Sequence, residues 1–128
     1  MAAKTKKPGI DLPLSGQSTF EVRRGEFRES FTVDFDDALK LNAFLRARKE
    51  ILDMIESVDA SDAEAAIETY AAVWSSLEPA VDMILGAGAC ERIFGGSQAV
   101  YGGLSLLTSL AEKVGPAYDA MFGADKQT

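Results

Sequence analysis

The residues that most resemble a ligand-binding motif lie in the stretch ILGAGACERIFGG, residues 84–96, which contains four glycines. Glycine-rich loops can cradle phosphate groups, because the missing side chain lets backbone amides approach a ligand closely. A dinucleotide fingerprint requires G-x-G-x-x-G between a strand and a helix, but Glu91 stands at the third glycine position and the preceding pattern is helical. A Walker-type loop requires a lysine after the glycines, and none lies between Lys49 and Lys113.

We therefore interpret this stretch as a structural corner between helices. Gly86 is predicted to end the first helix in the left-handed conformation, as glycine commonly does at such ends. Residues 87–94 are predicted to form a short helix or turn, with Ile93 and Phe94 anchored in the core. The predicted corner residues are Leu85, Gly86, Gly88, Ile93, Phe94 and Gly95.

Other candidate chemistry is sparse. The DFDD cluster, residues 34–37, has the residue types of a metal or phosphotransfer site, but at a strand-to-helix junction acids more often cap the helix. Cys90 has only Arg92 as a basic neighbour, which favours an inert core residue. Histidine is absent, which removes the usual general base and the commonest metal ligand. We predict no enzyme and no catalytic, cofactor-binding or metal-binding residues; the alternative of a small carboxylate enzyme would require two converging acids with raised pKa values.

The charge distribution is uneven. The net charge of −7 argues against nucleic-acid binding, which requires a basic surface. Ten acidic residues and no Lys or Arg occur from Glu50 to Glu91. This pattern is typical either of a solvated helix face or of a surface that steers a basic partner. The candidate steering residues are Asp53, Glu56, Asp59 and Asp62.

Length and composition indicate one globular domain. The chain has 128 residues, of which 47% are hydrophobic and 26% charged. We expect a flexible arm over residues 1–18, a single domain over 19–123 and a tail over 124–128. No apolar run is long enough to span a membrane, and no signal segment follows the basic N-terminus. With a single cysteine, these features predict a cytosolic protein.

The pattern of hydrophobic residues predicts a mainly α (α+β) fold, with an N-terminal hairpin packed on four or five helices. Apolar and polar residues alternate over 19–35 on both sides of Arg24-Gly25, which is typical of a β-hairpin. Helical periodicity then runs from about 36 to 122.

The first predicted helix spans about 36–58, with Leu52 on its apolar stripe, and the capping-box pattern Ser61–Glu64 marks the start of the second. The second carries Ile67 on its apolar side and is predicted to kink at Pro79 or to restart near Ser76.

Ser97 is a predicted cap for the last long helix. Gly102-Gly103 is expected either to weaken this helix or to let another helix approach closely. Gly115-Pro116 is predicted to end it, leaving a short turn over 117–122.

Together these segments resemble the small tail assembly chaperones of long-tailed bacteriophages and related prophages, over roughly residues 19–114. The resemblance is most specific in VDMILGAGACERIFGG, residues 81–96, where an Asp, apolar residues, Leu-Gly, small residues and Ile-Phe-Gly follow one another. Ala87 stands where an acid is common in the family, and Leu85 where Phe is common.

The resemblance implies a non-catalytic protein in the cytoplasm of the bacterial host that is absent from the mature virion. Family members bind the tape measure protein, keep it soluble and help to recruit the tail tube protein; many also exist in a longer, frameshifted form. Homo-oligomerisation is left open. The alternative is a structural virion component, such as a head–tail or tail-completion protein.

Overall fold

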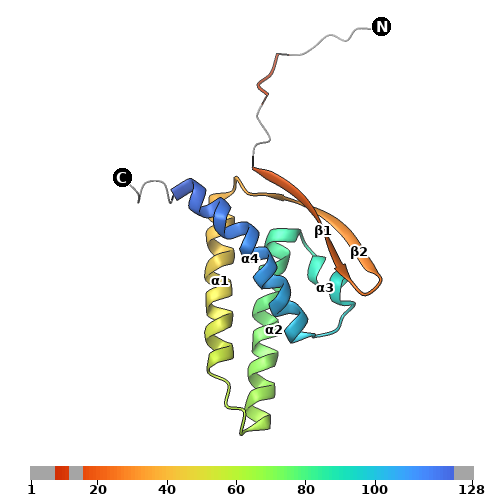
Figure 1. The fold of residues 1–128 in the computed structure, drawn as a ribbon, viewed down its shortest axis with the longest axis vertical. Coiled ribbons are helices and arrows are strands. Elements are labelled where there is room, and N and C mark those ends of the chain that lie inside the picture. Colours follow the sequence, from red (N-terminus) through yellow and green to blue (C-terminus); the bar gives the residue numbers. More distant parts are fainter. Residues whose placement is uncertain (1–7, 12–15, 123–128) are drawn as a thin grey trace.

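The computed structural model describes residues 8–11 and 16–122. In these residues the chain forms one β-hairpin followed by four helices (Figure 1). The elements are β1 (Gln17–Arg24), β2 (Phe27–Asp34), α1 (Ala38–Glu56), α2 (Ala63–Leu85), α3 (Ala89–Phe94) and α4 (Val100–Phe122). The predicted α+β class, with an N-terminal hairpin and four or five helices, is confirmed. The predicted tail and most of the predicted arm lie outside the described residues, and β1 begins two residues before the predicted domain boundary.

The hairpin owes its tight turn to a single glycine. β1 and β2 pair antiparallel from Gln17↔Asp34 to Arg24↔Phe27, so that only two residues, Gly25 and Glu26, form the loop. Gly25 has a φ of +59°, while Glu26 keeps a negative φ. Glycine at the first of two loop positions is the pattern of a type II′ turn, whose twist matches that of the flanking strands.

Acidic side chains cap the N-termini of α1 and α2. The Asp37 carboxylate accepts a hydrogen bond from the Lys40 amide at 3.1 Å, and Asp62 accepts one from Ala65 at 3.1 Å. Each bond satisfies an amide that has no partner within the helix. The DFDD cluster therefore contributes the cap of α1, and the cap of α2 is Asp62, one residue after the Ser61 of the predicted capping box.

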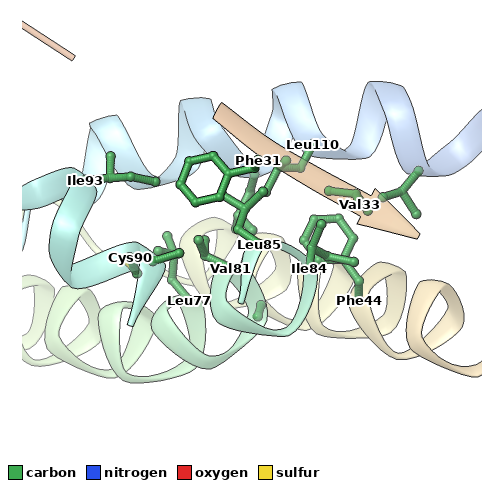
Figure 2. Close-up of a cluster of buried hydrophobic side chains, with 14 of the residues drawn as sticks. Phe31, Val33, Phe44, Leu77, Val81, Ile84, Leu85, Cys90, Ile93 and Leu110 are labelled. Carbon is green, nitrogen blue, oxygen red and sulfur yellow. The ribbon is translucent and has the colours of Figure 1, made fainter. Parts of the chain in front are cut away.

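All four helices and the hairpin contribute to the core. Helices α1 and α2 form an antiparallel pair, α4 crosses this pair, and the hairpin lies at the end of α2 beside α3 (Figure 1). Figure 2 shows Phe31 and Val33 of β2 pointing into the space between α2 and α4. There Phe31 is 4% exposed and Val33 1%, and Phe44 of α1 is fully buried. A lone hairpin is marginally stable in water, and this insertion explains how the helices hold it.

The prediction that Gly115-Pro116 ends the last helix was wrong, and the second helix does not restart near Ser76. Helix α2 continues through Pro79, which is flanked by the buried residues Leu77 and Ala80. Helix α4 continues through Gly115-Pro116 to Phe122. Beyond Pro116, the Tyr118 hydroxyl bonds to the Asn42 Oδ1 atom of α1 at 3.2 Å, which ties the last turns to the bundle. Proline inside a helix removes one backbone hydrogen bond and crowds the preceding turn, so contacts of this kind are needed to keep the helix continuous.

The start of α4 differs from the prediction, whereas its glycine pair matches one of the two predicted alternatives. Helix α4 begins at Val100, so Ser97 does not flank it. Of the two alternatives for the glycines, close helix approach is the one observed. A Cβ atom on Gly103 would lie 2.7 Å from Leu77 Cδ1, and one on Gly102 would lie 3.0 Å from Phe94 Cε1. The distance at Gly103 is shorter than real Cβ atoms show, so this glycine permits the close contact between α2 and α4, while Gly102 lies in a tight contact with α3.

Two residues expected in the core are exposed. Leu52 of α1 is 37% exposed and Ile67 of α2 is 67% exposed. Both belong to the part of the α1–α2 pair that extends away from the hairpin, beyond the reach of α4 (Figure 1). The periodicity identified the apolar side of each helix correctly, but no third element covers that side here.

Candidate functional site

The predicted corner, residues 85–95, joins α2, α3 and the segment before α4. Gly86 ends α2 with a φ of 113° and a ψ of 156°, which is an extended conformation with positive φ and differs from the predicted left-handed helical one. The left-handed conformation occurs instead at Gly88 and Gly95, which flank α3. Side-chain-bearing residues rarely adopt a positive φ, which accounts for the glycines without a phosphate ligand.

Asp82 provides the cap that α3 lacks locally. The residue before α3 is Gly88, which has no side chain. One oxygen of the Asp82 carboxylate accepts from the Cys90 amide at 2.9 Å, and the other accepts from the Gly88 amide at 3.1 Å. The carboxylate therefore takes the place of an N-cap side chain and lies at the positive end of the short helix. This bridge fixes the angle between α2 and α3.

An ion pair connects the corner to the hairpin. The Arg92 guanidinium donates to both carboxylate oxygens of Glu29, at 3.0 and 2.8 Å, and Arg92 also donates to the Ala87 carbonyl at 3.4 Å. The hydrogen bond from Arg92 lowers the pKa of Glu29, and the same bond raises the pKa of Arg92. Because both groups are partly exposed, the pair positions the hairpin more than it stabilises the fold.

The apolar part of the corner is buried. Leu85 is 8% exposed, Ile93 3% and Phe94 4%. The Phe94 ring meets the Trp74 ring edge to face at 5.4 Å between centroids, a favoured aromatic geometry. Cys90 is fully buried, and burial raises the pKa of its thiol to about 12. The thiol is thus protonated at neutral pH, as expected of an inert core cysteine.

The four predicted steering acids all lie at the end of the α1–α2 pair that is farthest from the hairpin, which we call the acidic end (residues 50–68). All four are exposed, and three of them have local partners. Asp62 caps α2, and Asp59 accepts from the Ser61 amide and hydroxyl at 3.0 and 2.6 Å, which lowers the Asp59 pKa. Asp53 forms an ion pair with Lys49 at 3.5 Å. The four residues lie in the last turn and a half of α1 and in the connection to α2.

A groove that the sequence did not predict lies between β1 and α4. It has a volume of about 410 Å³ and an apolar floor that includes Ile93 and Phe94 of the corner. Its wall on β1 is the run Phe20–Arg24, and its wall on α4 lies between Gly102 and Lys113.

Two cations cover aromatic rings at this groove. The Arg24 guanidinium carbon lies 5.0 Å from the Phe94 ring centroid, and the Lys113 Nζ atom lies 4.8 Å from that of Phe20. A cation over the face of an aromatic ring is attracted by the electron density of the ring. The groove thus combines an apolar floor with positive charge at its edges, in a chain whose net charge is −7.

Comparisons with known proteins identify no relative: no protein-family model, curated protein or solved structure matches the chain. Among residues 8–11 and 16–122, no helix is long and apolar enough to cross a membrane. The same residues contain no cluster of three or more Cys, Asp or Glu side chains arranged to hold a metal ion.

Sequence reasoning missed Asp82 as a capping residue and the groove as a surface. A signal for Asp82 did exist: an acid precedes a helix start whose own cap position is glycine, and a glycine cannot supply the missing acceptor. The groove has no comparable signal, because β1 and α4 are separated by most of the chain.

Proposed function

We propose that the protein is a tail assembly chaperone of a long-tailed bacteriophage or prophage. In this role it binds and solubilises the tape measure protein and helps to recruit tail tube subunits, without catalysis. The supporting observation is that the residues on which the resemblance rests form one connected unit. Asp82 bonds to the amides of Gly88 and Cys90, and Ile93 and Phe94 are buried directly behind it. The motif is therefore a single structural feature, and its spacing has a physical reason.

The surface of the protein suits a reversible binding partner. Tape measure proteins are, in this family, long helical chains with apolar stripes, which aggregate when exposed. The helices here carry exposed apolar side chains that could shield such stripes: Leu39, Leu52, Ile67, Tyr101 and Phe122. Because they are scattered, the affinity is expected to be modest, which allows tail tube subunits to displace the chaperone.

Co-expression tests the proposal. The tape measure protein encoded beside this chain should be soluble when both are produced together and should precipitate when produced alone. The two should also elute as one complex in size-exclusion chromatography. Equal precipitation with and without this chain, and no complex on the column, would contradict the proposal.

Mass spectrometry of purified particles distinguishes the chaperone from a structural virion component. A chaperone that acts in the bacterial cytoplasm and leaves during tube assembly should be missing from mature particles. Stoichiometric presence would favour a head–tail or tail-completion protein instead.

A further inference from the structure

The groove between β1 and α4 follows the free edge of the hairpin. Five consecutive residues of β1, Phe20–Arg24, line it, although neighbouring side chains of a strand point to opposite faces. Both faces of a strand can border one groove only if the groove runs along the strand edge. No residue of β2 lines it, so this is the edge of β1 that faces away from β2.

Backbone groups of this edge are free to pair. In a hairpin with a two-residue loop, the residues that flank the loop form a hydrogen-bonded pair, and the pairs alternate from there. Glu21 and Arg23 then belong to non-hydrogen-bonded pairs, so their N–H and C=O groups point away from β2. The Thr19 and Thr32 hydroxyls, 2.8 Å apart, support this phase, because side chains are closer in non-hydrogen-bonded pairs. Within residues 8–11 and 16–122, no backbone bond from another element reaches Glu21 or Arg23.

The groove also has the side-chain chemistry of a peptide site. Its floor contains the apolar residues Ile93, Phe94, Leu106 and Leu110. Arg23 pairs with Glu21 at 3.4 Å, whereas Arg24 and Lys113 lie over the rings of Phe94 and Phe20. Glu21 is the only acid among the lining residues, so the lining has a net positive charge.

We propose that this groove binds an extended peptide, as a third strand on β1, that presents one apolar side chain between two acidic ones on the same face (acidic–x–apolar–x–acidic). The peptide backbone would pair with Glu21 and Arg23, its apolar side chain would cover the floor, and its two carboxylates would meet Arg24 and Lys113, which lie on the floor side of β1. The charge of the rim disfavours the N-terminal arm as the occupant, because that arm carries Lys4, Lys6 and Lys7. The inference is independent of the proposed chaperone function, since it rests only on the edge, the floor and the charges.

Peptide selection on the full chain tests this proposal. A hexapeptide library that samples apolar, acidic, basic and neutral residues at every position is selected on the immobilised protein, and the enriched peptides are measured by fluorescence polarisation. Glu21→Pro removes one outward N–H group, and proline is tolerated at such edge positions. The matched control is Ser30→Pro, which changes the residue paired with Glu21 on the opposite edge. Circular dichroism checks that both variants remain folded.

The expected result is enrichment of peptides that carry an apolar residue between two acidic ones at every second position. Their affinity should fall by about tenfold or more in Glu21→Pro, as expected for the loss of a well-made hydrogen bond, and remain near the wild-type value in Ser30→Pro. The double variant Arg24→Glu/Lys113→Glu should lose binding, whereas Arg28→Glu, on β2, should retain it. The proposal is overturned if no peptide class is enriched, if basic peptides are enriched, or if binding persists in folded Glu21→Pro. A dimer in sedimentation that Glu21→Pro abolishes would also overturn it, because the occupant would then be a second copy.

Discussion

The corner and the acidic end of the α1–α2 pair lie at opposite ends of the same helix, α2, and differ in how they are held. At the corner, Asp82 bonds to two amides, Arg92 pairs with Glu29, and Phe94 packs on Trp74. At the acidic end, the hydrogen bonds are local and the apolar residues Leu52 and Ile67 are exposed. The comparison indicates that long-range contacts are concentrated at the corner, and that the acidic end is held mainly by the packing of α1 on α2.

The strongest way to break this comparison is to remove the aromatic anchor of the corner. Phe94→Ala should lower the free energy of unfolding by about 3–5 kcal/mol, because it leaves a cavity beside Trp74. Chemical denaturation measures this value. Ile67→Ala, at the exposed acidic end, is the control and should change it by well under 1 kcal/mol. A Phe94→Ala variant as stable as the wild type, but unable to bind its partner, would show that the corner is an interface.

Substitutions at Gly102 and Gly103 of α4 test how closely this helix packs on the corner end of α2. Gly103→Ala should destabilise the fold by about 1–3 kcal/mol, because the new methyl group would overlap Leu77 in the core. Gly102→Ala should destabilise the fold less, because its methyl group would lie 3.0 Å from Phe94 Cε1, a contact that a small shift of the ring relieves. Thermal unfolding of the two variants gives the sign. Stabilisation by both substitutions would mean that α2 and α4 are not in close contact at Gly103.

Removing the Asp82 bridge should have a smaller effect. Asp82→Ala leaves the Gly88 and Cys90 amides without their acceptor, at a cost of about 1–2 kcal/mol. Asp82→Asn keeps one acceptor oxygen, so its free energy of unfolding should lie between those of Asp82→Ala and the wild type. If Asp82→Ala has the stability of the wild type in urea denaturation, the bridge does not hold the corner.

The smallest change in stability is expected at the acidic end. Asp53→Asn, Glu56→Gln, Asp59→Asn and Asp62→Asn, made together, should alter the unfolding free energy little, since Asn caps helices as well as Asp. The same variant should bind the tape measure protein more slowly or aggregate more readily, with little change in equilibrium affinity at physiological salt. Stopped-flow association at low and high salt checks this. An affinity loss that salt does not diminish would assign these acids to the binding contact itself.

The sequence predicted features that depend on neighbouring residues. Alternation around Gly25 located the hairpin, and the glycines at 86, 88 and 95 located the corner. Predictions from the sequence failed where contacts between distant segments determine the structure. Helix α4 continues through Gly115-Pro116, and the bond between Tyr118 and Asn42 ties its last turns to α1. The groove could not be predicted, because it exists only after β1 and α4 come together.

Hydrogen exchange of individual amides tests the central contrast most directly. The Gly88 and Cys90 amides, which bond to Asp82, should exchange only through opening with a free energy near that of global unfolding. Amides of residues 57–62, which connect α1 and α2, should exchange through local opening at much lower free energy. Asp82→Ala should abolish the high protection at Gly88 and Cys90 and leave the α1–α2 connection unchanged. Equal protection of the two regions, or greater protection of residues 57–62, would contradict the account.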